Sequence, residues 1–153
     1  MKRSPLKRKS RSPNAIVKDN IQEYVRLIVS IRDKGCVLRS VRGCGAICEV
    51  IDDKVVSTTV IQADHLITRA NSATFADYRL IVCICRACHG WKHWHEKEYD
   101  SLVKTVISKE VLDLWEKCEL DRQAHKTYKV DFVMELLHLK QEYARLIQQS
   151  KTD

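Results

Sequence analysis

The side chains best suited to chemistry in this chain gather in residues 63–94, which read ADHLITRANSATFADYRLIVCICRACHGWKHW. Two of them, Cys85 and Cys88, form a Cys-x-x-Cys pair that is followed at once by His89. A tight turn with two residues between the thiolates brings both sulfurs onto one metal ion, so this pair is half of a tetrahedral zinc site. The other half must come from elsewhere in the chain.

Three upstream cysteines, Cys36, Cys44 and Cys48, are available to complete that site. We favour Cys36 with Cys44, because Gly45 follows Cys44 and a glycine there lets backbone N–H groups turn towards the thiolate. Cys48 in place of Cys44 is the alternative. The sequence thus predicts a structural Zn²⁺ ion bound by Cys36, Cys44, Cys85 and Cys88.

A second set of side chains, Asp64, His65, His89 and His93, suits an open metal site with a base beside it. A neutral imidazole with a pKa near the reference value of about 6.5 is a competent base at working pH, and we assign that role to His65. Asp64 and His89 would hold one divalent ion. His93 follows His89 by one helical turn and is a candidate third ligand.

Two β-branched strands are expected over residues 49–53 and 54–63, with Asp52-Asp53 as the hairpin turn between them. The second strand delivers Asp64 and His65 at its end. Neighbouring residues on a strand point to opposite faces. A twist or bulge at the strand end is therefore needed to bring Asp64 and His65 round a common site.

Helices are expected on both sides of this region. Apolar residues at helical spacing predict a helix over residues 14–35, capped by Asn14 and ended by Gly35. Beyond Tyr99, two short apolar stripes, a polar link and a long final stripe predict further helices. The final helix either covers the core or forms a two-fold homodimer.

Composition favours a nucleic-acid partner. The chain has 153 residues and a net charge of +7. Residues 1–13 form a basic arm with no apolar face, which we expect to be disordered and either to bind phosphates or to be only a solvated terminus. No apolar run is long enough to span a membrane and the basic N-terminus lacks the apolar segment of a secretion signal, so we expect a soluble, intracellular protein and no membrane partner. The odd count of seven cysteines then argues for metal ligands and buried thiols such as Cys83 and Cys118.

Further DNA contacts are expected from basic residues beside the metal sites. Arg39 and Arg42 lie in the loop between the upstream cysteines, where they either touch DNA or are only solvated. Lys92 lies between Trp91 and Trp94, and such aromatics stack on unpaired bases while the ammonium meets phosphate. The alternative is packing, and we expect one tryptophan to pack and the other to be exposed. The full set of candidate DNA-binding residues is Lys7, Arg8, Lys9, Arg11, Arg39, Arg42 and Lys92.

The order of an upstream cysteine pair, a strand ending in Asp64-His65, a loop, and Cys85-x-x-Cys88-His89 opening a helix resembles the HNH (ββα-metal, His-Me finger) endonuclease family. Within it the chain looks most like the phage NinG/Rap recombination nucleases, and more distantly like phage recombination endonuclease VII. The segments IRDKGC, QADHL, CRACHGWK and YKVDFVMELLHLKQEYARL carry this likeness over most of residues 20–148.

The resemblance implies an α+β fold with a zinc-stapled ββα-metal core. Its parts would be residues 1–13 as the arm, 14–35 as a helix, 36–97 as the nuclease core and 98–153 as a helical region. It also implies metal-dependent hydrolysis of DNA, with Mg²⁺, Mn²⁺ or another divalent ion at Asp64 and His89, on branched or recombination-intermediate DNA. The expected ends are 5′ phosphate and 3′ hydroxyl, and a phage-encoded protein would act in the host cytoplasm.

One position departs from the family pattern. The middle Asn of HNH, which braces the loop and orients the base, falls at Leu80 in this chain. Asn71, Asp77 or a backbone carbonyl could take over that role. If none does, the alternative function is a non-catalytic, zinc-dependent DNA-binding module.

Overall fold

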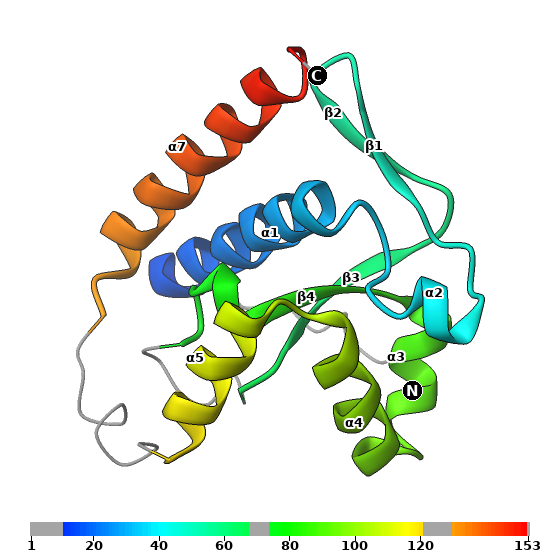
Figure 1. Cartoon of the computed structure of the whole chain (residues 1–153). Helices are drawn as coiled ribbons and strands as arrows, with labels where there is room; N and C mark the ends of the chain where they lie inside the picture. Colours follow the sequence, from blue (N-terminus) through cyan, green and yellow to red (C-terminus); the bar gives the residue numbers. More distant parts are fainter. Residues whose placement is uncertain (1–10, 68–73, 121–129, 153) are drawn as a thin grey trace, which may run out of the picture.

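A computed structural model describes residues 11–67, 74–120 and 130–152 of the chain. It is an α+β fold in which two antiparallel sheets of two strands each lie among helices (Figure 1). Lys7, Arg8 and Lys9 lie outside the described residues. Among the helices in the described ranges, none combines the length and the apolar character needed to cross a bilayer.

Helix α1, Pro13–Asp33, runs through the middle of the molecule and buries Ile21, Val25, Ile28 and Val29 (Figure 1). Its cap is Ser12, whose hydroxyl accepts from the backbone N–H of Ala15, with Pro13 as the first helical residue. The expected cap at Asn14 is therefore wrong. Proline has no N–H to satisfy and its fixed φ suits the first turn, so the helix begins one residue earlier.

Helix α1 ends at Asp33, two residues before the end of the predicted range, and Gly35 follows its cap, Lys34. Lys34 and Gly35 both have positive φ, 52° and 122°. A Cβ atom on residue 35 would lie 2.2 Å from the carbonyl oxygen of Ala46, so only glycine fits this crossing. The crossing brings the chain after α1 alongside residue 47, with which Gly35 forms an isolated β-bridge.

The first sheet is the hairpin of β1, Cys48–Ile51, and β2, Lys54–Ser57. Asp52 and Asp53 have φ values of 48° and 61°, as a two-residue turn of the I′ type requires, so the predicted hairpin turn is confirmed. The single strand expected over residues 54–63 is wrong, because β2 ends at Ser57. There Thr58 accepts from the N–H of Ile47 at 3.0 Å and Ser57 donates to the carbonyl of Thr59 at 2.7 Å. These side-chain hydrogen bonds compete with the backbone hydrogen bonds that one continuous strand would need.

The second sheet pairs β3, Ile61–His65, with β4, Ile81–Cys85, in antiparallel register from Ile61 opposite Cys85 to His65 opposite Ile81. Every residue of β4 is buried. The 3₁₀ turn η1, Tyr78–Leu80, enters β4, and α3, Arg86–Lys92, leaves it without an intervening loop. The chain thus forms two antiparallel strands followed directly by a helix.

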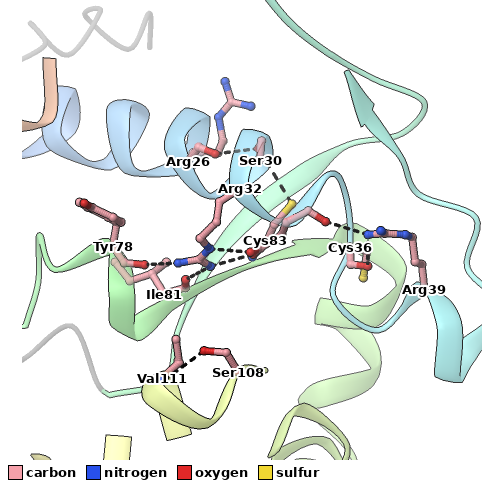
Figure 2. A network of polar contacts seen from close by, with 11 residues as sticks. Arg26, Ser30, Arg32, Cys36, Arg39, Tyr78, Ile81, Cys83, Ser108 and Val111 are labelled. Carbon is pink, nitrogen blue, oxygen red and sulfur yellow. Dashed lines mark hydrogen bonds and ion pairs between the residues drawn. The ribbon is translucent and has the colours of Figure 1, made fainter. Parts of the chain in front are cut away.

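Polar contacts fasten the C-terminal end of α1 to this second sheet (Figure 2). Arg32 donates to the carbonyl oxygens of Tyr78 at 2.7 Å and Ile81 at 2.8 Å. Ser30, one turn from the helix end, donates to Arg26 O at 2.7 Å and lies 3.9 Å from the sulfur of Cys83. The buried strand β4 therefore has a fixed orientation relative to α1.

Helices cover the remaining sides: α4, Glu96–Val106; α5, Lys109–Leu120; and α7, Phe132–Gln149. These three match the apolar stripes in the sequence, whereas the polar link, residues 121–127, falls outside the described residues. Helix α7 packs along α1, with the rings of Tyr143 and Tyr24 5.8 Å apart (Figure 1). Asp131 caps α7 through the backbone N–H groups of Val133 and Met134.

Candidate metal centre and the adjacent polar site

Four cysteines, Cys36, Cys44, Cys85 and Cys88, bring their sulfurs within 4.8 Å of one another. Ideal tetrahedral coordination at Zn–S distances of about 2.3 Å places sulfurs about 3.8 Å apart, so a modest contraction suffices for one ion. All four are thiols, and three are buried. The cluster can hold a metal ion and is compatible with structural zinc, as the spacing of the cysteines predicts.

Different elements deliver the four sulfurs. Cys36 follows the end of α1, and Cys44 follows the short helix α2, Arg39–Arg42, between Gly43 and Gly45 with φ values of 64° and 63°. The prediction of a loop in place of α2 is wrong. Cys85 ends β4 and Cys88 lies in the first turn of α3. A metal ion here would join the chain after α1 to the junction between β4 and α3.

Cys48, the alternative to Cys44, lies with Cys83 and Ser30 instead of with the four-cysteine cluster. It is buried on β1, where burial raises the pKa of its thiol and Cys83 and Ser30 are its hydrogen-bonding neighbours. Burial likewise raises the pKa of Cys83. Cys83 and Cys118 are both core residues, as expected.

The thiols of the cluster differ in acidity. Burial raises the pKa of Cys36, and that of Cys88 to about 11. Burial opposes ionisation of Cys85 too, but hydrogen bonds from the N–H of Cys88 and from neighbouring thiols outweigh it and lower the pKa of Cys85. Among these three thiols, Cys85 is therefore the easiest to ionise.

The two arginines beside the cluster are engaged within the fold. Arg39 donates to the carbonyl oxygens of Asp33 at 2.8 Å and Cys36 at 3.4 Å (Figure 2). The guanidinium of Arg42 lies 3.7 Å from the ring centroid of Trp91. Trp91 is also stacked on His95 at 5.0 Å, whereas Trp94 is 87% exposed. The expectation that one tryptophan packs and the other is exposed is confirmed, with Trp91 as the packed one.

Beside the cysteines, Asp64 and His89 lie next to each other. Asp64, near the end of β3, is 5% exposed, and its Oδ1 is 3.8 Å from Nε2 of His89 on α3. The rings of His89 and His93 are 4.9 Å apart. The structure thus brings Asp64 and His89 together and puts His93 next to His89. In the described residues, the cysteine cluster is nevertheless the one group of three or more ligands that converges within 4.8 Å.

Two further side chains complete the surroundings of Asp64. The ammonium of Lys92 is 2.9 Å from Oδ1 and 2.8 Å from Oδ2, and the hydroxyl of Tyr99 donates to Oδ2. Tyr99 is buried, and burial beside Asp64 raises its pKa strongly. Lys92 was expected to contact phosphate, and Tyr99 had no expected role. The signal for Lys92 was its spacing, three residues past His89 and on the same helical face.

His65 follows Asp64 at the end of β3. The five pairs between β3 and β4 run without a bulge, so the bulge, one of the two expected ways to bring these residues together, is absent, and regular pairing directs Asp64 and His65 to opposite faces of β3. The Nε2 atom of His65 is 3.2 Å from the carbonyl oxygen of Phe75, and its Nδ1 atom is buried. Since a carbonyl only accepts, Nε2 carries the proton in the neutral imidazole.

The group that braces His65 is thus a backbone carbonyl, one of the substitutes expected for the missing Asn. Leu80 is buried, and Asp77 caps η1 and pairs with Arg79 at 2.7 Å. Asn71 lies outside the described residues.

Comparison with known proteins yields no relative: no family model, curated protein or solved structure matches this chain. Its chemistry is therefore inferred from the geometry of its own residues.

Proposed function

We propose that this protein is a metal-dependent DNA endonuclease of the HNH type, acting on branched or recombination-intermediate DNA. The observation that carries the proposal is the position of Asp64 and His89. They lie 3.8 Å apart on β3 and α3, in a strand–strand–helix unit whose junction holds the four-cysteine cluster. That order of elements is what a ββα-metal core would have.

The donors present suit a divalent ion. Two ligand atoms about 2.1 Å from one ion, at angles of 90–110°, are about 3.0–3.4 Å apart, so the 3.8 Å between Oδ1 and Nε2 requires a small contraction. A carboxylate with an imidazole accommodates Mn²⁺ or Mg²⁺ completed by water and phosphate oxygens. A bound ion would act as a Lewis acid on the phosphodiester.

In this proposal His65 is the general base. The carbonyl of Phe75 holds the proton on Nε2, which leaves the lone pair of Nδ1 to take a proton from the attacking water. Asp64 and His65 point to opposite faces of β3 and Nδ1 is buried, so the strand end must twist and the side chains around Nδ1 must shift before His65 can take a proton from a water near Asp64. His93 would support His89 as a further ligand.

The remaining parts of the proposal concern binding. A structural zinc ion in the cysteine cluster would fix α3 to β4 and so hold His89 against Asp64. The net charge of +7 supports a DNA partner, with Arg11 and the arm before it as phosphate contacts. A homodimer through α7 is supported by Val133, Met134 and Leu137, which are exposed on that helix and available for burial against a second copy.

The test compares cleavage of nicked, linear and four-way DNA by the zinc-loaded protein with Mg²⁺ or Mn²⁺. We expect cleavage of the four-way DNA, and its loss in His65→Ala and Asp64→Asn. Equal activity of His65→Ala would remove this residue as the base. Absence of cleavage with every substrate and ion would overturn the proposal.

A second function, a zinc-dependent DNA-binding module without catalysis, is favoured by one observation. Lys92 places its ammonium on both oxygens of Asp64, which makes the carboxylate part of a structural ion pair. Such a module would bind DNA in a zinc-dependent manner and leave it intact. Asp64→Asn would then lower the stability of the protein, and neither the variant nor the unaltered protein would cleave DNA.

A further inference from the structure

Lys92 occupies an unusual position for a lysine on a predicted DNA-binding surface. Its side chain is 21% exposed, its ammonium bridges both oxygens of Asp64, and it lies 4.7 Å from the ring centroid of Tyr99. Tyr99 in turn donates to the same carboxylate. The carboxylate of Asp64 on β3, the ammonium of Lys92 on α3 and the phenol of Tyr99 on α4 are therefore all in contact with one another.

This set cannot persist unchanged when a divalent ion binds Asp64. An ion shared with His89 must lie about 2.1 Å from Oδ1, and Lys92 Nζ already lies 2.9 Å from that atom. Both cations would contact the same oxygen, so they would lie at most about 5 Å apart and would repel each other strongly where solvent screening is weak. The lysine and the ion are therefore alternatives on one carboxylate.

We propose that Lys92 is a positioning residue that competes with the divalent ion for Asp64. In the metal-free protein it neutralises the buried carboxylate and keeps it aimed at His89, and on metal binding its ammonium leaves. This inference rests on the proposed function, because it needs an ion site at Asp64 and His89.

The surroundings give the displaced ammonium a second partner. Burial raises the pKa of Asp100, and the positive charge of Lys92 is the largest influence that opposes this shift. A lysine side chain has four methylene groups and can swing between neighbouring acceptors. Tyr99 keeps its hydrogen bond to Asp64 in both states, so the carboxylate stays in place while its counter-ion is exchanged.

The test measures Mn²⁺ binding to the zinc-loaded protein by the electron paramagnetic resonance signal of free Mn²⁺. Mn²⁺ suits carboxylate and imidazole ligands and leaves the thiolate site to zinc. We expect Lys92→Gln to tighten Mn²⁺ binding by about tenfold or more, because a full competing charge is removed. Lys92→Arg, which keeps the charge, should bind Mn²⁺ no more tightly than the unaltered protein.

Lys97→Gln is the matched control, since it removes an exposed lysine five residues further on without touching Asp64. An equal gain in Lys97→Gln would show a general charge effect and overturn the inference. So would unchanged Mn²⁺ affinity in Lys92→Gln, provided that Asp64→Asn abolishes binding. If Asp64→Asn leaves Mn²⁺ binding unaffected, or if the unaltered protein binds no Mn²⁺, the proposed function fails as well.

A thermal scan provides the second readout for a destabilised variant. In the zinc-loaded protein without added Mn²⁺, Lys92→Gln should melt below the unaltered protein, because a buried carboxylate has lost its charged partner. Saturating Mn²⁺ should raise its melting temperature more than that of the unaltered protein. Equal shifts in the two proteins would contradict competition.

Discussion

The carboxylate of Asp33, the last residue of α1, accepts a hydrogen bond of 2.8 Å from the backbone N–H of Cys83 in the middle of β4. This hydrogen bond joins two elements that are distant in sequence, and Cys83 lies two residues before the cysteine that ends β4. Asp33 also pairs with Arg32, so that one side chain organises the end of the helix. The cysteine cluster is built on this junction.

Replacing Asp33 should therefore weaken the fold. Asp33→Ala leaves the N–H of Cys83 without its acceptor in a buried strand, and we expect the free energy of unfolding to fall by about 1–3 kcal/mol. Urea denaturation of the zinc-loaded protein measures this. Asp113→Ala, which removes an exposed ion pair with Lys109, is the control and should change stability by less than about 0.5 kcal/mol. Equal effects of the two variants would contradict the assigned role of Asp33.

Gly35 and Gly90 should respond in opposite ways to alanine. At Gly35, φ is 122° and the new Cβ would meet the carbonyl oxygen of Ala46 at 2.2 Å, so we expect a loss of about 2–4 kcal/mol. Gly90 lies inside α3 with open space around its Cα, and alanine there should gain about 0.5–1 kcal/mol. Denaturation midpoints of both variants provide the check. A neutral Gly35→Ala would mean that the chain crosses differently after α1.

Zinc content should distinguish Cys44 from Cys48. Cys44→Ser removes a sulfur from the cluster, so the purified protein should hold less than one equivalent of zinc and lose structure together with the metal. Cys48→Ser should keep its zinc, because Cys48 lies with Cys83 and Ser30. Metal analysis with circular dichroism measures both properties. A folded sample of the unaltered protein without bound metal would refute the structural role of zinc.

Zinc uptake should release protons. The pKa of Cys88 is raised to about 11 by burial, and that of Cys36 is raised as well, so both thiols are protonated at neutral pH in the metal-free cluster. Zinc binds thiolates, which means that each of these protons is expelled and that affinity rises with pH below these pKa values. Calorimetry in buffers of different ionisation enthalpy counts the protons. A zinc affinity that is flat between pH 6 and 8 would contradict protonated thiols.

Removing residues 1–10 should weaken DNA binding and flatten its dependence on salt. This deletion keeps Ser12, the cap of α1, and Arg11. On duplex DNA, the slope of log K against log salt should fall by about 0.9 for each phosphate that the arm neutralises in the full chain. A neutral segment of the same length in place of the arm controls for chain length. If the slope is unchanged, the arm does not bind phosphates.

Part of the fold follows from local sequence. Ile21, Val25 and Ile28 at helical spacing mark α1, and Asp52-Asp53 between β-branched runs marks the hairpin. These signals are strong because each depends on residues close in sequence. The division of residues 54–63 into β2 and β3 depends on side-chain hydrogen bonds of Ser57 and Thr58, which propensity does not encode.

The candidate site divides in the same way. The Cys-x-x-Cys spacing identifies Cys85 and Cys88 as candidate metal ligands, and Gly45 favours Cys44 over Cys48 as a further ligand. The partners of Asp64 have no such signal, since Tyr99 on α4 reaches Asp64 on β3 through a contact between residues far apart in sequence. Arg39 and Arg42 were expected either to touch DNA or to be only solvated, whereas in the structure one guanidinium binds backbone carbonyls and the other covers an indole ring. Which of these partners a side chain contacts depends on the tertiary structure and cannot be predicted from local sequence.

The arrangement of the four sulfurs has a consequence for newly made chains. Cys36 and Cys44 leave the ribosome well before Cys85 and Cys88, and all the strands lie in between or at the boundary of that interval. A single ion would join the two ends of this long segment, and contacts between residues so far apart in sequence form slowly during folding. We therefore expect maturation to depend on zinc supply, with starved cells degrading the polypeptide before it accumulates.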